Sequence, residues 1–195
     1  ALREMLSRRK VFGLLFGIAR FVRPVLPPTL KKKVQPPQPA GQWPLRTSSR
    51  QMLLHEGCVQ PAMMPNVDAA TARVFDRLGI ELVIARSAEC CGAIRQHLND
   101  HHGAEAQMKR NIDAWWPYVE KGIDTIVINA SGCGVMIKDY AEILANDPSY
   151  ADKAKRISSM AKDISEILPS FTTEIEALAS QKRAGALPER VTYHP

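Results

Sequence analysis

The four cysteines of this chain are the residues whose type and spacing point to chemistry. Cys90 and Cys91 are adjacent and precede Gly92, while Cys58 and Cys133 lie on either side of that pair. Each cysteine position follows a short apolar run typical of a strand and precedes a segment with helical spacing. The carboxyl ends of parallel strands meet at one edge of a sheet, where open α/β sheets bind their ligands. The sequence therefore predicts that the four thiols converge.

The elements that would position these thiols alternate along the chain. The apolar runs expected to form strands lie at Met52–His55, Ile80–Ala85 and Asp124–Asn129. Helices are predicted after them over residues 66–78, 93–121 and 135–145, and a further helix over residues 151–168. Alternating strands and helices of this length imply a parallel sheet with right-handed crossovers. The predicted fold class is therefore α/β, a Rossmann-like three-layer unit with a short parallel sheet.

Cysteine thiolates are soft ligands that select zinc, copper(I) or iron–sulfur clusters. Zinc sites usually contain paired cysteines two to four residues apart, and this sequence has no CxxC pair. Two adjacent thiolates cannot easily chelate one small tetrahedral ion, but they can bind different iron atoms of a larger cluster. The pattern therefore favours an iron–sulfur centre. Two other interpretations stay open. One is a structural zinc module, and the other is a metal-free thiol–disulfide pair formed by Cys90 and Cys91.

Small and polar residues beside the cysteines are expected to line the cofactor. Glycine permits close approach of the backbone, and N–H groups in such loops can point at sulfide. The glycines expected in this role are Gly57, Gly92, Gly132 and Gly134. Asn129 and Ser131 are expected to donate hydrogen bonds to cluster sulfur, which tunes its potential. His55 is expected either beside a ligand or as an unusual ligand itself.

No residue pattern indicates a catalytic site. The motif GxGxxG is absent, so the sheet is not expected to bind NAD, and no residue is recognisable as a base acting on a substrate.

A secretory signal is not visible, and a chain with an ordinary core does not need disulfides. We therefore expect a protein of the reducing cytoplasm.

The first 45 residues differ from the rest in charge and composition. Residues 1–50 contain eleven Lys or Arg and one acid, a charge of +10, whereas the other 145 residues carry fifteen basic and nineteen acidic side chains, a charge of −4. Apolar spacing predicts a helix over residues 1–22, and the prolines between residues 31 and 44 predict a semi-rigid linker. The helix is expected either to pack on a neighbouring domain or to lie on an anionic membrane surface. No aromatic platform accompanies the lysines, so nucleic acid is not an expected partner.

Three motifs occur in order at the cysteine positions, HEGCVQP at His55–Pro61, ECCGA at Glu89–Ala93 and NASGCG at Asn129–Gly134. Together with the stretch Pro65–Val83, they resemble the cysteine-rich, or CCG, domain. That domain occurs in heterodisulfide reductases, in the small component of anaerobic glycerol-3-phosphate dehydrogenase, in lactate-utilisation proteins and in the iron–sulfur subunits of glycolate oxidase. The resemblance is closest to the last of these and covers about residues 50–170.

The resemblance implies an iron–sulfur electron-transfer subunit of a flavin-linked 2-hydroxy-acid dehydrogenase, with Cys58, Cys90, Cys91 and Cys133 as ligands of a [4Fe–4S] type cluster. FAD is expected on the partner subunits, which would oxidise glycolate to glyoxylate and send electrons towards a quinone. This chain alone is expected not to be catalytic, and peripheral contact with the inner membrane surface is a further expectation. A heterodisulfide-reductase-like thiol/disulfide domain is the alternative within the family.

The domain organisation that follows is a helix and linker at residues 1–45, a CCG domain at 46–170, and a linker with the start of a second CCG domain at 171–195. The family also implies a ferredoxin-like module before this segment, so we interpret the chain as a fragment. Many family members end the third motif in CxxC, but Met136 occupies the second cysteine position here. The domain therefore offers four thiolates rather than five.

Overall fold

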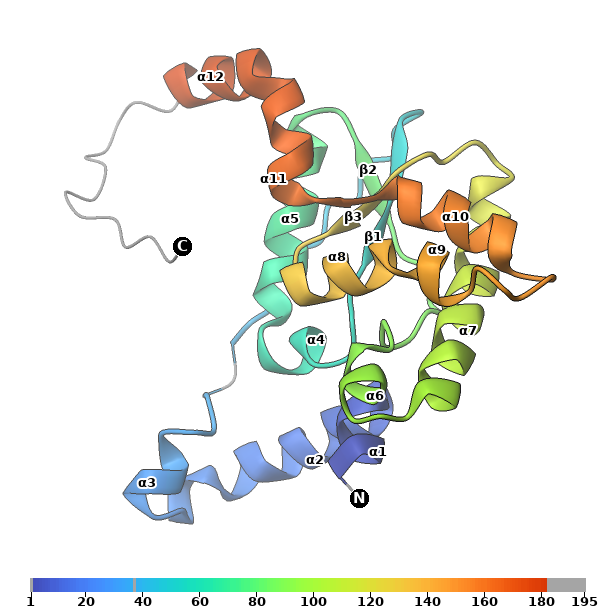
Figure 1. Cartoon of the computed structure of the whole chain (residues 1–195). Coiled ribbons are helices and arrows are strands. Elements are labelled where there is room, and N and C mark those ends of the chain that lie inside the picture. The colour runs from blue at the N-terminus through green and yellow to red at the C-terminus, as the bar shows by residue number, and fades with distance from the viewer. Residues whose placement is uncertain (1, 37, 182–195) are drawn as a thin grey trace.

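A four-stranded parallel sheet lies between two layers of helices (Figure 1). The computed structural model describes residues 2–36 and 38–181. The strands are β1 (Gln51–His55), β2 (Glu81–Val83), β3 (Ile126–Ile128) and β4 (Ala161–Asp163), in the order β2-β1-β3-β4. All the pairings are parallel, so every strand has its carboxyl end at the same edge of the sheet.

The central strands are short apolar runs buried on both faces, as expected for a parallel sheet between helical layers. All of β3 is fully buried. The register pairs Leu53 of β1 with Ile126 of β3, and His55 with Ile128. Strands β1 and β3 therefore end level with each other and release their following loops side by side.

Helices cover both faces of the sheet, which confirms the predicted three-layer α/β fold. The larger core contains the fully buried side chains of Trp115 and Tyr140, and the core on the other face contains Phe75. The first face is covered by α7 (His101–Val119), α8 (Ser131–Lys138), α9 (Tyr140–Ile143) and α10 (Ala151–Met160). The second face is covered by α5 (Pro65–Arg77), α11 (Ile164–Ile167), the 3-10 helix η2 (Leu168–Phe171) and α12 (Thr172–Gln181).

The prediction of one continuous helix over residues 151–168 is wrong at its centre, because the strand β4 interrupts the helix. Ala161 pairs with Ile126, so the chain adds a fourth strand at the edge of the sheet. Asp163 then begins α11 with a capping box, in which its carboxylate accepts from the Ser165 N–H and the Glu166 side chain accepts from the Asp163 N–H. A cap of this kind defines a new helix start, which is why the segment does not continue as one helix.

The helical region predicted over residues 93–121 consists of α6 (Ala93–His97) and α7. The sequence predicts a break near His101–Gly103, and the structure has it slightly earlier, at residues 98–100. Asn99 has a positive φ of 58°, and the Asp100 carboxylate accepts from the Gly103 N–H to cap α7. An asparagine tolerates this left-handed conformation better than most residues, so it ends the first helix at little cost.

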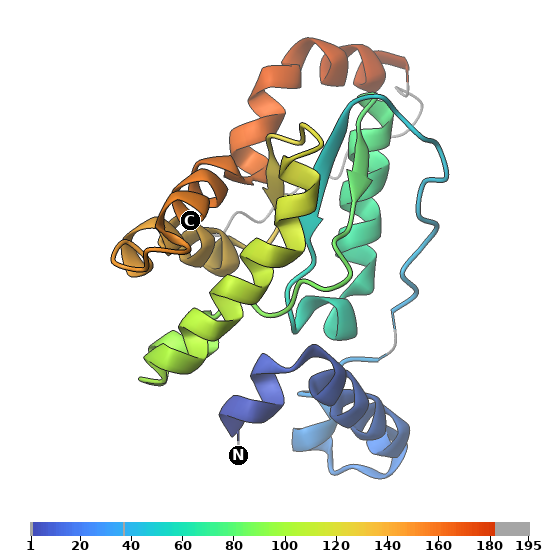
Figure 2. The ribbon, with the colours of Figure 1, turned by 90° about the vertical axis from the view of Figure 1, so that its right-hand side faces the viewer.

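The N-terminal helices α1 (Leu2–Ser7) and α2 (Arg9–Val22) lie below the carboxyl edge of the sheet in both views (Figures 1 and 2). The sequence predicts a helix that is attached only loosely. The structure anchors it through an ion pair of 2.5 Å between Arg9 and Glu56 and through a hydrogen bond of 3.0 Å from the Gln107 amide to the Ser7 carbonyl. The helix α1 packs against α6, and α2 packs against α4 (Gln60–Met63).

The chain then runs through the 3-10 helix η1 (Arg23–Val25) and α3 (Pro28–Lys31), and the described residues between α3 and β1 form no further helix or strand. Pro37 of the predicted linker lies outside the described residues, as do residues 182–195 of the segment expected to begin a second CCG domain. Among the helices that the structure describes, none is both long and apolar enough to cross a membrane.

The buried centre of β3 predicts a large effect of truncation there. Replacing Ile126 with Ala should lower the free energy of unfolding by about 2–5 kcal/mol, because it leaves a cavity between two helical layers. Val74→Ala, at a half-exposed position of α5, removes apolar surface without opening a core cavity. This change should alter the free energy of unfolding by no more than about 0.5 kcal/mol. Urea unfolding measures both values. Equal effects would mean that β3 is not at the centre of the core.

Candidate metal centre

The structure brings all four thiols together at the carboxyl edge of the sheet. Cys58 lies in the loop after β1, Cys90 and Cys91 in the loop after β2, and Cys133 in the first turn of α8 after β3. The Cys58 and Cys90 sulfurs are 3.3 Å apart, and the Cys91 thiol forms a hydrogen bond with Cys133. None of the four forms a disulfide. The predicted convergence is therefore observed.

The four sulfurs share their protons unequally. Hydrogen bonds from Cys58 and then Cys91 lower the pKa of Cys90 to about 3, and a hydrogen bond from Cys91 lowers the pKa of Cys133 to about 5. The pKa values of the two donors, Cys58 and Cys91, are raised by this donation and by burial. The hydrogen bonds thus favour the thiolate form at Cys90 and Cys133 and the thiol form at Cys58 and Cys91. A cation bound among them would relieve the cost of burying this charge.

His55, the last residue of β1, lies beside the thiols. Its ring forms a hydrogen bond with Cys133 that contributes to the lowered pKa of that thiol. The ring packs edge-on against Trp115, with centroids 5.5 Å apart. Its Nε2 atom is buried and has no hydrogen-bond partner among the described residues. An unpaired polar atom is costly in such a place, and its position beside four thiols fits a group that is bound there.

Two residues that the sequence analysis did not single out hold the Cys90–Cys91 loop. The Asn111 amide donates to the Cys90 carbonyl at 2.9 Å, and the Tyr140 hydroxyl donates to the Cys91 carbonyl at 2.7 Å. Asn111 also donates to the Tyr140 hydroxyl at 3.2 Å and accepts from the Glu89 N–H at 2.7 Å. Both side chains are fully buried. The backbone of the paired cysteines is therefore held from beneath by a connected polar network.

One signal in the sequence could have revealed Asn111. It falls on the same helical stripe as Met108, Ile112 and Trp115, all of them buried in α7. A polar residue on an otherwise apolar stripe needs a buried partner. Tyr140 carries no comparable signal, because a tyrosine among apolar residues is an ordinary core residue whose hydroxyl finds some partner.

The glycines of the motifs have different local roles. Gly57 and Gly92 have positive φ values of 72° and 97°, a conformation that favours glycine. A β-carbon at Gly57 would lie 3.8 Å from the Cys133 sulfur, and one at Gly134 would lie 3.7 Å from Ile128. A β-carbon at Gly132 would meet nothing within 4 Å. Their contact with a cofactor stays a prediction.

The amide of Asn129 is engaged with other protein groups rather than with a thiol. Its nitrogen donates to Asp68 at 2.8 Å and to the Thr71 hydroxyl at 3.3 Å, and its oxygen accepts from Gln60 at 2.7 Å. Burial raises the pKa of Asp68, while the amides of Asn129 and Gln60 oppose that rise. This second network joins the loop that follows Cys58 to the exit of β3. The side chain of Ser131 is exposed at the start of α8, so a hydrogen bond from either residue to cluster sulfur stays a prediction.

The donor set fits an iron–sulfur cluster better than a single metal ion. Within the described residues, no group of three or more His, Cys, Asp or Glu side chains is arranged as one metal ion requires. The sulfurs instead lie as neighbouring pairs contributed by three loops. The adjacent Cys90 and Cys91 cannot easily chelate one small tetrahedral ion, and this favours separate iron atoms of one cluster over a zinc site.

Comparison with known proteins also supports an iron–sulfur site in the part of the chain that carries the cysteines. Residues 52–138 match a family model described as a cysteine-rich domain, CCG. The glycolate oxidase iron–sulfur subunit of Escherichia coli K12 is 42% identical over 93% of this chain and 45% of its own length. The probable glycolate oxidase iron–sulfur subunit of Bacillus subtilis 168 is 26% identical over 89% of this chain and 37% of its own length.

Lactate utilization protein A of Geobacillus thermodenitrificans NG80-2 is 26% identical over 70% of this chain and 53% of its own length. The chain thus spans about half the length of these curated relatives or less. No solved structure matches the chain.

The buried network beneath the paired cysteines predicts a clear difference between two tyrosines. Tyr140→Phe should lower the free energy of unfolding by about 1–3 kcal/mol, because the Cys91 carbonyl and Asn111 lose a buried partner. Tyr150→Phe removes a hydroxyl whose hydrogen bond to Asp113 is exposed. This variant should change the free energy of unfolding by no more than about 0.5 kcal/mol. Chemical denaturation of the two variants measures the difference. If Tyr150→Phe is the more harmful, the Cys91 carbonyl does not depend on Tyr140.

Proposed function

Because residues 52–138 belong to the cysteine-rich CCG domain family, we propose that this chain binds an iron–sulfur cluster and relays electrons within a hydroxy-acid oxidase. The proposed ligands are Cys58, Cys90, Cys91 and Cys133, and the proposed cluster is of the [4Fe–4S] type. The observation that carries the proposal is the meeting of four non-disulfide thiols from three loops at one sheet edge.

The chain's own residues would hold and tune such a cluster. A bound cluster would supply the ability to accept and release one electron at a time. Asn111 and Tyr140 fix the backbone of the paired cysteines, and His55 lies against Cys133. Gly57 leaves the Cys133 sulfur unobstructed on one side. These contacts set the position and surroundings of the thiolates, which are the means by which a protein tunes a cluster's potential.

We extend the proposal to the whole protein through its relatives. They are named as iron–sulfur subunits of glycolate oxidase and as a lactate utilization protein, so the proposed complex oxidises a 2-hydroxy acid, with glycolate as the first candidate. FAD on a partner subunit would take a hydride from that acid, and this subunit would carry the electrons onward, one at a time, towards a quinone. The chain itself would have no catalytic residue. A cytoplasmic location would keep its thiols reduced.

The exposed face of α2 supports peripheral contact with a membrane as part of this proposal. Leu14, Ile18 and Phe21 are 67%, 52% and 86% exposed, and the helix also carries the cations Arg9, Lys10 and Arg20. A helix with apolar side chains on one face and cations on another binds at the interface of an anionic bilayer. Such contact would bring the cluster near a quinone dissolved in the membrane.

Anaerobic reconstitution of the full chain tests the cluster. The protein should take up iron and acid-labile sulfide and turn brown, and Cys91→Ser should remove most of this uptake, because a hydroxyl replaces one of four thiolate ligands. Ala93→Ser is the matched control, since it places a hydroxyl two residues away, at the start of α6, and leaves every thiol in place. Iron and sulfide analysis gives the stoichiometry. Stoichiometric zinc uptake without any uptake of iron and sulfide would support the structural zinc module instead.

Vesicle binding tests the membrane contact separately. The chain should bind anionic vesicles at low salt and leave them at high salt, since each surface Lys or Arg contributes about 1 kcal/mol that salt screens. Phe21→Glu should abolish binding, whereas Leu45→Glu, at a linker position that is 96% exposed, should not. Deleting residues 1–44 should also abolish binding and leave the body folded by circular dichroism. Equal loss with Leu45→Glu would contradict this role, and unfolding of the shortened chain would mean that residues 1–44 belong to the core.

A further inference from the structure

A cleft of about 780 Å³ lies beside the Cys90–Cys91 loop and is separate from the cysteine site. Four separate segments line it, namely the N-terminal helices, the loop after β2, α6 and α7. We call it the basic cleft. Its lining residues are Arg8, Arg9, Lys10, Val11, Arg86, Ser87, Ala88, Glu89, Arg95, Gln107 and Arg110.

The basic cleft has more positive than negative charge. Six of its lining residues are Arg or Lys and one is Glu. The ion pairs of these cations bring in Glu4, Glu56 and Asp100, so six cations face four carboxylates, which leaves a surplus of two positive charges. Lys10 and Arg86 form no ion pair within the described part of the chain and are exposed. These two side chains are therefore available to a ligand.

The paired cations are held in place rather than mobile. Glu4 bridges Arg8 at 2.9 Å and Arg95 at 2.8 Å, and Arg95 is bound on its other side by Asp100. Arg110 is bound by Glu89 at 3.1 Å. This arrangement joins α1 to α6, which lies next to it in Figure 1, and through Asp100 to the start of α7. The cleft is therefore a preformed surface, and its net positive charge comes from the two unpaired side chains, Lys10 and Arg86.

The basic cleft lies against the cysteine loop. Glu89 lines it and is the residue before Cys90. Arg110 also lines it, and the next residue, Asn111, binds the Cys90 carbonyl. A molecule seated in this cleft would therefore lie within a few residues of the proposed cluster. Electron transfer requires such an approach, and weak electron-transfer complexes have small interfaces that opposite charges steer into place.

We propose that the basic cleft is the docking surface for an acidic segment of the subunit that delivers electrons to this chain. This inference rests on the proposed function and adds the place and chemistry of the contact. The exposure of Arg8, Lys10, Arg86 and Arg110 favours a protein surface over a small anion. A small anion would need donors that converge in an enclosed site, whereas cations along the sides of a wide cleft match carboxylates spread along a chain.

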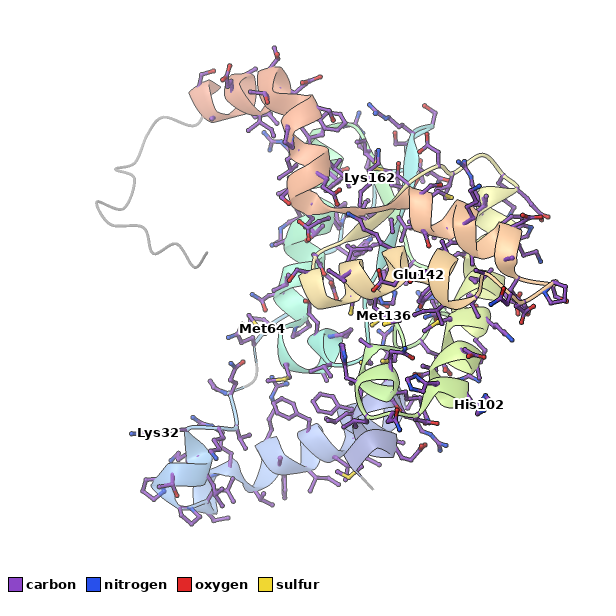
Figure 3. The ribbon with its side chains drawn as sticks, in the orientation of Figure 1. Lys32, Met64, His102, Met136, Glu142 and Lys162 are labelled. Atoms are coloured by element: carbon purple, nitrogen blue, oxygen red, sulfur yellow. The ribbon has the colours of Figure 1, made fainter. Side chains whose placement is uncertain are left out.

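A fluorescent hexaglutamate peptide serves as the probe, added to the full chain at low salt and followed by fluorescence anisotropy. The double variant Lys10→Glu with Arg86→Glu should bind it about tenfold more weakly, since it reverses both available charges. The matched control is Lys32→Glu with Lys33→Glu, which makes the same change of charge. Figure 3 shows Lys32 pointing away from the body at the far end of the N-terminal helices. This control should stay within about threefold of the parent, since salt screens distant charges.

Two results would overturn the docking surface. One is equal weakening by the two double variants, which would mean that net charge rather than the cleft binds the peptide. The other is displacement of the peptide by inorganic phosphate at a similar concentration, which would mean a small-anion site. Iron and sulfide uptake by the Lys10→Glu, Arg86→Glu variant should equal that of the parent, because both residues lie outside the cysteine motifs. Absence of uptake in both proteins alongside normal peptide binding would count against the proposed function and not against the docking surface.

Discussion

The parallel pairing of β1 with β2 and β3 determines where all four thiols lie. In a parallel sheet every strand releases its following loop at the same edge, so three cysteine-bearing loops that are far apart in sequence meet without any direct attraction between them. The register that aligns His55 with Ile128 makes two of these loops leave the sheet at the same level. A slip in that register would move Cys58 away from Cys133 and divide the site.

Two buried polar networks then hold the loops from different sides. On the side of α7, Asn111 and Tyr140 bind the carbonyls of Cys90 and Cys91. On the side of α5, Asp68 and Gln60 bind the amide of Asn129 and so connect the loops that carry Cys58 and Cys133. The groups in these networks satisfy one another, which keeps the backbone fixed while the sulfurs point inward. Thiolates removed from water are costly by themselves, and a cluster with positively charged iron offsets that cost.

Much of this arrangement follows from the sequence, because apolar runs followed by cysteines indicate both the strands and the loops that follow them. The fourth strand, β4, could not be predicted from the sequence in this way. Ala161, Lys162 and Asp163 form no apolar run, and their conformation comes from pairing with the free edge of β3. Tyr140 could not be predicted either, since its partner is a backbone carbonyl 49 residues away along the chain. The Asn129 amide is predicted to donate to cluster sulfur, and a buried carboxylate at Asp68 competes for the same donor. The contacts of α1 depend on ion pairs between distant segments, which spacing alone does not reveal.

The identity of the bound group is tested most directly by X-ray absorption at the iron edge of anaerobically prepared protein. Ligation by Cys58, Cys90, Cys91 and Cys133 predicts iron surrounded by sulfur in the first shell and by other iron atoms in the second. A first shell of nitrogen and oxygen, or sulfur-bound iron without an iron neighbour, would contradict the proposed cluster.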